Sequence, residues 1–200
     1  YKRQHVTKGI NKAPLLETHA PGPITMESCH WSFQPVTFDH RDYSASIRRA
    51  GWAALVLDPI IDGYHFTRVL MDGGSSLNLI YQDTVRNMGI DPAKISHSNT
   101  TFKGVTPGLG ARCTGSLLLQ VIFGSLDNFR CEHLTFHIAP FQSGYQALLG
   151  HEAFTRFNAI PHYASLTLKM PGPRGIITVH RNIKRSLCAE ESEAALAAAH

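Results

Sequence analysis

The fold is decided by residues 67–80, which read Thr67-Arg68-Val69-Leu70-Met71-Asp72-Gly73-Gly74-Ser75-Ser76-Leu77-Asn78-Leu79-Ile80. An apolar run ends in the single carboxylate of Asp72, two glycines follow, and a second apolar run begins after the serines. Apolar runs of this length predict buried strands, so Asp72 is expected at a strand end beside the core, where an isolated charge is costly. Gly73 and Gly74 leave room for a ligand or another backbone, and nearby N–H groups and the Ser75 hydroxyl are expected to donate to the carboxylate.

An aspartate before glycine is more often an ordinary turn residue, and Asp62-Gly63 is predicted to be one. It lies between the apolar runs 55–61 and 64–70, which is the pattern of a β-hairpin with a two-residue turn. Asp72 differs in context. Of the eight aspartates in the chain, it alone combines an apolar strand before it, a glycine two positions later and a second apolar strand after it.

The composition is that of a globular chain of 200 residues, enough for one domain with extensions. Because the chain begins with Tyr, we expect it to be a segment of a longer product. The formal net charge is +4, and part of the excess lies in residues 1–12, where so few dispersed charges favour a solvated linker over a nucleic-acid site. No apolar run reaches the roughly 18 residues of a membrane span. The sequence therefore predicts an intracellular, cytoplasmic protein without membrane contact.

Metal and cofactor chemistry finds little support in the sequence. The four cysteines lie far apart with no Cys-x-x-Cys pair, so reduced thiols are expected. Alternation over residues 129–138 places Cys131, His133 and His137 on one strand face, but such side chains on a wet face are more typical of plain surface residues than of a metal site. Nucleotide-binding glycine patterns are absent. We predict no metal and no cofactor.

Four regions are predicted along the chain. Residues 1–28 are expected to be a basic flexible linker, and residues 29–54 an edge strand containing Pro35 followed by a connector. Residues 55–170 are dominated by strand patterns and form the main domain, with a short helix over 82–88. Residues 171–200 are expected to be an extension that ends in an Ala/Glu-rich surface helix.

Two further segments of the main domain have distinctive patterns. Three glycines and a proline lie between strand signals in residues 101–112, which predicts a mobile hairpin. An apolar strand over 145–150 ends in Leu148-Leu149-Gly150 and precedes a short helix over 151–157. Together with the Asp72 stretch, these segments give a fixed order of three short motifs.

In that order the motifs resemble a retropepsin-type aspartic protease, and they are most similar to the protease region in polyproteins of plant gypsy-like LTR retrotransposons. The resemblance covers roughly residues 55–170 and, more loosely, residues 31–39. It implies a mainly β, retropepsin-like closed barrel with one or two short helices. It also implies a homodimer with a polypeptide substrate, in which nucleic acid is contacted only through flanking polyprotein domains or the basic N-terminus.

The resemblance assigns roles to individual residues. Asp72 matches the catalytic aspartate, Gly74 the invariant glycine and Ser75 the Ala or Ser that follows. Gly73 departs from the enzymes, which carry Thr or Ser there to tie the two active-site loops of the dimer together, although the plant group often has Gly-Gly. Leu148, Leu149 and Gly150 match the motif that supports the catalytic loop. The flap is implied to comprise Gly104, Val105, Thr106, Pro107, Gly108, Leu109 and Gly110.

Two functions follow from this pattern. The first is an aspartic endopeptidase that processes a retrotransposon polyprotein, with one catalytic Asp72 per chain. The alternative is a catalytically degenerate retropepsin-like module that only dimerises or binds peptides. Gly73 favours the degenerate module, and retention of Asp72, Gly74 and the Leu-Leu-Gly motif favours the enzyme.

Overall fold

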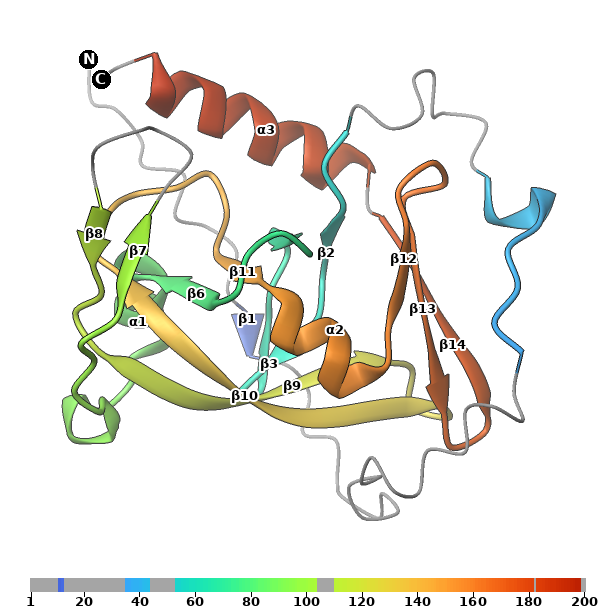
Figure 1. Ribbon diagram of the computed structural model, residues 1–200, viewed down its shortest axis with the longest axis horizontal. Coiled ribbons are helices and arrows are strands. Elements are labelled where there is room, and N and C mark those ends of the chain that lie inside the picture. The colour runs from blue at the N-terminus through green and yellow to red at the C-terminus, as the bar shows by residue number, and fades with distance from the viewer. Residues whose placement is uncertain (1–10, 13–34, 44–52, 104–109, 182, 199–200) are drawn as a thin grey trace.

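The computed structural model describes residues 11–12, 35–43, 53–103, 110–181 and 183–198. In this part of the chain a curled nine-stranded sheet dominates, with the strand order β1-β4-β3-β9-β10-β6-β11-β5-β2 (Figure 1). Its strands are β1 (Asn11–Lys12), β2 (Val56–Leu57), β3 (Ile60–Ile61), β4 (Tyr64–His65), β5 (Val69–Met71), β6 (Asn78–Tyr81), β9 (Ser116–Gly124), β10 (Phe129–Ala139) and β11 (Ala147–Leu149). The mainly β fold class predicted from the sequence is confirmed.

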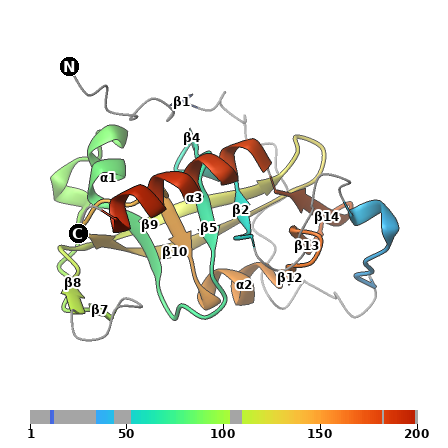
Figure 2. The same cartoon turned by 90° about the horizontal axis from the view of Figure 1, so that it is seen from above.

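Two smaller sheets and three α-helices complete the described fold. Strands β12 (Ile160–His162), β13 (Thr167–Gly172) and β14 (Gly175–His180) form one sheet, and β7 (Thr101–Lys103) pairs with β8 (Gly110–Arg112) in the other. The helices are α1 (Gln82–Met88), α2 (His151–Phe157) and α3 (Ile183–Ala197), and short 3-10 turns lie at His40–Asp42 and Pro92–Lys94. In Figures 1 and 2, α3 lies beside β2 at one edge of the large sheet, and α2 lies against its interior strands β10, β11 and β6.

Local sequence patterns account for the bounds and turns of several of these elements. Helix α1 ends at Met88 because Gly89 adopts the left-handed conformation, with φ 62°, that a C-cap glycine supplies without strain. Asp62 and Gly63, at φ 49° and 77°, form the predicted two-residue turn between β3 and β4. Along β10 the buried and exposed positions alternate, with Leu134, Phe136 and Ile138 turned into the core.

One hydrophobic core joins the nine-stranded sheet, the β12–β14 sheet and the helices α1 and α2. Its fully buried large side chains come from widely separated parts of the chain: Phe66, Phe136, Phe157, Leu55, Leu57, Ile61, Leu79, Ile80, Leu134, Leu149, Leu168 and Met170. The rings of Phe123 and Phe157 meet edge to face at 5.2 Å between centroids, which joins β9 to α2. Helix α2 is therefore packed on the large sheet, and its position fixes the segments on either side of it.

Three expectations differ from the structure. The described residues 35–39 of the expected edge strand are not a strand: Pro35 lacks an N–H, and Asp39 instead caps the turn at His40–Asp42. Within the expected N-terminal linker, Asn11–Lys12 pairs with β4. The chain also continues past Met170 in a regular hairpin, because the proline at 171 lies opposite Ile176 and the strands stay paired to Gly172 and Gly175.

Candidate active site

Three strand ends place Asp72 beside the Leu-Leu-Gly segment. Strand β11 lies between β5 and β6, parallel to the first and antiparallel to the second, with Leu149 opposite Met71. The end of β5, the end of β11 and the beginning of β6 therefore meet at one edge of the sheet. There the backbone N–H of Asp72 donates a hydrogen bond of 2.9 Å to the carbonyl oxygen of Leu149. The structure thus brings Asp72 and residues 148–150 together.

The Asp72 carboxylate is held at the surface by its own loop. Its Oδ1 accepts a hydrogen bond of 2.9 Å from the Gly74 N–H, and its carbonyl oxygen accepts one of 3.2 Å from the Ser75 N–H. Asp72 is half-buried, whereas Gly73 and Gly74 are exposed. The carboxylate is thus anchored on one oxygen and lies beside an open stretch of backbone, an arrangement that allows a water or a peptide to reach it.

One expectation about this loop was wrong. The Ser75 hydroxyl does not donate to the Asp72 carboxylate; it donates to the carbonyl oxygen of Leu77 at 2.9 Å. The Leu77 N–H returns a hydrogen bond of 3.3 Å to the same hydroxyl oxygen. Ser75 therefore closes a small turn within the loop, as serine side chains commonly do two residues from a backbone partner. Its role is to shape the loop that carries Asp72.

Gly150 is required by close backbone packing. A Cβ at this position would lie 2.4 Å from the Leu77 carbonyl oxygen and 2.6 Å from that of Ser75. Beside this contact, the His151 N–H donates a 2.7 Å hydrogen bond to the Ser75 carbonyl oxygen. The beginning of α2 is thus pressed against the loop, and this explains physically why a glycine follows the two leucines.

Asn78 is a buried polar residue whose role the sequence analysis did not identify. Its Oδ1 accepts the Gly150 N–H at 2.9 Å, while its Nδ2 donates to the Thr135 carbonyl oxygen at 3.1 Å and to Glu152 Oε2 at 2.8 Å. One side chain therefore links β6, β10 and α2. The available signal was an amide inside an otherwise apolar run, because a fully buried polar side chain needs partners.

A second buried amide aligns the other end of the same strands. Gln146 Oε1 accepts the N–H groups of Thr67 and Arg68 at 2.7 and 3.0 Å, and the Gln146 N–H donates to the Arg68 carbonyl oxygen at 2.9 Å. These bonds bind the segment before β5 to the segment before β11. Because both strands are fixed at their entry, their exits at Asp72 and Gly150 are held in register.

Gly73 lies close to two aromatic side chains. Its φ is outside the left-handed region, and a Cβ built on it would lie 3.6 Å from Tyr163 Oη and 3.9 Å from Phe154 Cε2. Both are ordinary van der Waals distances. A side chain at this position is therefore compatible with the backbone, and the glycine is not imposed by a turn.

The expected flap lies mostly outside the described residues. Gly104, Val105, Thr106, Pro107, Gly108 and Leu109 belong to the part of the chain that the structure does not describe, whereas Gly110 begins β8. The two strands on either side pair in antiparallel fashion, with Lys103 opposite Gly110. In Figure 2 the β7–β8 pair and the β5–β6 connection extend toward the same side of the molecule.

The alternative metal site on β10 is not assembled among the described residues. Cys131, His133 and His137 do lie on one face of the strand, but the described chain contains no cluster of three potential metal ligands. His137 Nδ1 instead lies 3.1 Å from the Ser98 hydroxyl. Cys131 is a free thiol whose pKa is raised by burial.

No helix in the described part of the chain is long and apolar enough to cross a bilayer.

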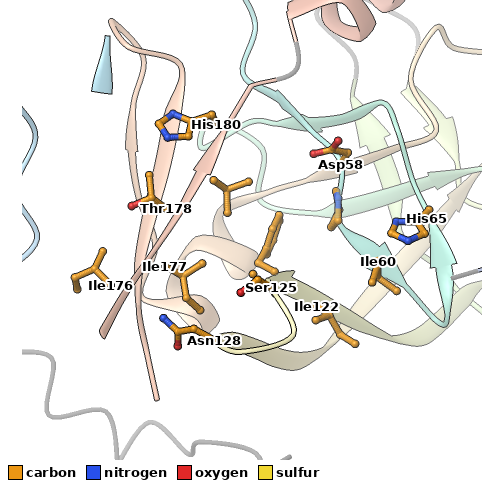
Figure 3. A pocket seen from close by; sticks show the side chains of 14 residues that line it. Asp58, Ile60, His65, Ile122, Ser125, Asn128, Ile176, Ile177, Thr178 and His180 are labelled. Carbon is orange, nitrogen blue, oxygen red and sulfur yellow. The ribbon is translucent and has the colours of Figure 1, made fainter. Parts of the chain in front are cut away.

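A cavity of about 440 Å³ lies elsewhere, between β14 and the β3–β9 side of the large sheet (Figure 3). Its lining includes Asp58, His65, Ser125, Thr178 and His180 over apolar side chains of β9 and β14. None of the residues around Asp72 lines it. The cavity is therefore separate from the candidate active site.

Comparisons with known proteins place the likeness at the level of the fold. No protein-family model matches the chain, and no curated protein sequence matches it. Among solved structures it is similar to the retroviral protease-like domain of Ddi1 from Leishmania major, with 14% identity, coverage of 64% of this chain and 94% of that chain, and a TM-score of 0.49. It is also similar to a retropepsin-like aspartic protease from Rickettsia conorii, with 13% identity, coverage of 62% and 79%, and a TM-score of 0.41.

Proposed function

We propose that this chain is an aspartic endopeptidase that acts as a homodimer, with Asp72 as its catalytic carboxylate. The observation that carries the proposal is the placement of Asp72, which ends a core strand, remains accessible and is fixed by the Gly74 and Leu149 backbone. Structural support from Asn78 and Gly150 lies directly behind it. A surface turn has no need of so much buried hydrogen bonding.

The chemistry needs two such carboxylates close together. Two neighbouring carboxylates cannot both ionise, so the pair retains one proton. The ionised partner removes a proton from a water molecule, whose oxygen attacks the carbonyl carbon of the substrate peptide, while the protonated partner donates its proton to the carbonyl oxygen. The tetrahedral adduct then releases the amine as its nitrogen is protonated, and the C–N bond breaks. One water is consumed, and a carboxylic acid and an amine are formed.

A homodimer follows from the single Asp72 in each chain. A two-fold axis that passes between two copies would bring the same loop of each chain together, because an isologous interface repeats every contact. The half-exposed carboxylate and the exposed glycines are the parts of the loop that would face this axis. An extended polypeptide substrate would lie across the two loops beneath the β7–β8 hairpins.

The natural substrate that we propose is the polyprotein of a retrotransposon, from which the domain would be released. This narrower assignment rests on the motif order described above. Contact with nucleic acid would then belong to flanking polyprotein domains or to the basic N-terminus. We further propose an intracellular site of action, where such a polyprotein is made.

The deciding experiment compares Asp72→Asn with Asp62→Asn. Purified protein at acid pH is incubated with an unfolded protein substrate, and new N-termini are counted over time. Asp72→Asn should abolish cleavage because the amide cannot accept the water proton. Asp62→Asn is the matched control: residue 62 is exposed in the β3–β4 turn at φ 49°, a conformation that asparagine tolerates, so cleavage should continue unchanged. Persistent cleavage by Asp72→Asn would remove Asp72 from the mechanism.

A second candidate is a retropepsin-like module that dimerises or binds peptides without cutting them. Gly73 favours it, because this position carries no hydroxyl to tie two loops together. The same assay separates the two functions. A module of this kind would bind an extended peptide equally well with Asp72 or Asn at position 72, and the protein would release no new N-termini in either form.

A further inference from the structure

Tyr163 brings a hydroxyl to the loop that carries Asp72. It lies in the turn between β12 and β13, and its Oη is 3.6 Å from the position that a Cβ of Gly73 would occupy. Tyr163 is 43% exposed. Its hydroxyl has no hydrogen-bond partner among the described residues. A phenol hydroxyl next to exposed backbone is thus available to a partner outside the chain.

The turn that presents Tyr163 is firmly built. His162 Nδ1 lies 2.7 Å from the Ser165 hydroxyl, and the imidazole stacks on Phe38 with ring centroids 4.8 Å apart. Leu166 is buried and held at φ 53°, a conformation that is unfavourable for a leucine and persists only where surroundings enforce it. The Arg181 N–H donates to the Leu166 carbonyl oxygen at 3.0 Å. The turn backbone that carries Tyr163 is therefore fixed by contacts of its neighbours in the chain.

Gly73 and the Tyr163 hydroxyl are close neighbours. The glycine leaves space above the loop, and the Phe154 ring and the Tyr163 hydroxyl border that space. A hydroxyl carried by residue 73 would occupy the same neighbourhood. The loop has no side chain at position 73. The hydroxyl nearest to this position comes instead from Tyr163 in the β12–β13 turn.

We infer that Tyr163 is a positioning residue of the Asp72 loop, whose hydroxyl donates a hydrogen bond to the Asp72 loop of a second copy of this chain and replaces the hydroxyl that Gly73 lacks. The inference rests on the proposed homodimer. Exposed loop carbonyl groups are the acceptors that a phenol beside a two-fold axis would meet, and symmetry makes each such bond occur twice.

The test measures self-association rather than cleavage, by sedimentation of each variant across a dilution series. Tyr163→Phe keeps the ring and removes only the oxygen, so the dimer dissociation constant should rise by about 5-fold to 150-fold, as expected for two ordinary hydrogen bonds. Gly73→Thr in the Tyr163→Phe background should restore association, because position 73 accepts a Cβ without strain. Gly73→Thr alone should change the constant little.

Tyr43→Phe is the matched control. Tyr43 is 51% exposed and meets the same His162 ring edge-on at 5.7 Å, but it belongs to the segment before the main sheet. Its change should leave association unaltered. An unchanged dissociation constant in Tyr163→Phe would overturn the inference. An equal weakening in Tyr43→Phe would also overturn it, because it would assign the effect to the ring contacts around His162. Thermal unfolding of each variant checks that the fold is intact.

Failure of this inference can be distinguished from failure of the proposed function. If the wild-type protein cleaves substrate and Tyr163→Phe associates normally, only the role of Tyr163 is refuted. If Tyr163→Phe weakens a dimer that cleaves nothing, Tyr163 retains its role and the protease proposal fails. A wild-type chain that remains monomeric at the highest protein concentration would refute both.

Discussion

Among single residues, the glycines near Asp72 are not equivalent. A Cβ at Gly150 would lie within 2.6 Å of the backbone oxygens of Leu77 and Ser75, whereas the nearest atoms to a Cβ at Gly73 would be 3.6 Å away or more. The sequence predicted Gly73 and Gly74 as the close-approach positions and gave Gly150 a supporting role. The tightest contact lies at Gly150, and only the fold reveals it, because its neighbours are far away in the sequence.

Gly150→Ala should therefore destabilise the protein. Neither carbonyl oxygen can rotate away as a side chain would, so the backbone must shift, at a cost of about 1–3 kcal/mol in the free energy of unfolding. Urea denaturation followed by circular dichroism measures the change. Gly73→Ala is the comparison, and it should stay within about 0.5 kcal/mol of wild type because its Cβ meets only ordinary contacts. Equal stability of the two variants would contradict this account.

For the helices and strands, patterns within a few residues of each other were sufficient for much of the fold. The alternation of apolar and polar residues predicted β10, Gly89 predicted the end of α1, and Asp62-Gly63 predicted the β3–β4 hairpin. Each of these signals depends only on neighbouring residues. The pairing of strands that lie far apart in the chain could not be predicted from the sequence. The order of β5, β11 and β6 and the three bonds of Asn78 depend on residues far apart in the chain, and a single sequence contains no record of which strands meet.

The segment before the main sheet is attached through a buried ion pair. Lys169 Nζ lies 2.7 Å from Asp42 Oδ1 and also donates to the Thr37 carbonyl oxygen at 2.7 Å. The ammonium lies 4.8 Å from the centroid of the Phe38 ring. Hydrogen bonding from Lys169, followed by that from the Asp39 N–H, lowers the pKa of Asp42 below its usual value. One lysine of β13 thus holds the segment at three points.

This attachment predicts a loss of stability in acid. Because the pKa of Asp42 is lower in the folded chain than in the unfolded chain, its contribution is complete above the unfolded value of 3.8 and is lost as pH falls through the lowered folded value. The free energy of unfolding should therefore drop more between pH 6 and about pH 2 in wild type than in Asp42→Asn. Asp127→Asn, at an exposed turn position, should retain the wild-type drop. An Asp42→Asn protein with the full wild-type drop would show that the pair contributes nothing.

Taken as one unit, the described chain is half of the proposed active enzyme. The sheet delivers one carboxylate to an accessible loop, and the buried hydrogen bonds of Asn78 behind that loop come from the same chain. A single chain supplies one Asp72, and the proposed reaction needs two such carboxylates. The strand ends of β5 and β11 and the buried hydrogen bonds of Asn78 explain how Asp72 is held, and the need for two carboxylates explains why the proposed enzyme must pair.

Mixing wild-type and Asp72→Asn chains tests directly whether the reaction needs two Asp72 carboxylates. If Asp72 acts only in pairs, inactive Asp72→Asn chains will capture wild-type chains in dimers that contain a single carboxylate. In an equal mixture that has been allowed to exchange subunits, about one quarter of the dimers carry two Asp72 side chains, so activity per wild-type chain should fall by about half. Asp62→Asn chains, which keep Asp72, should not lower it. Cleavage should be recorded at a fixed total protein concentration, so that dissociation does not imitate the effect. Activity that stays proportional to the amount of wild-type chain, whatever the excess of Asp72→Asn, would mean that one chain carries the whole catalytic site.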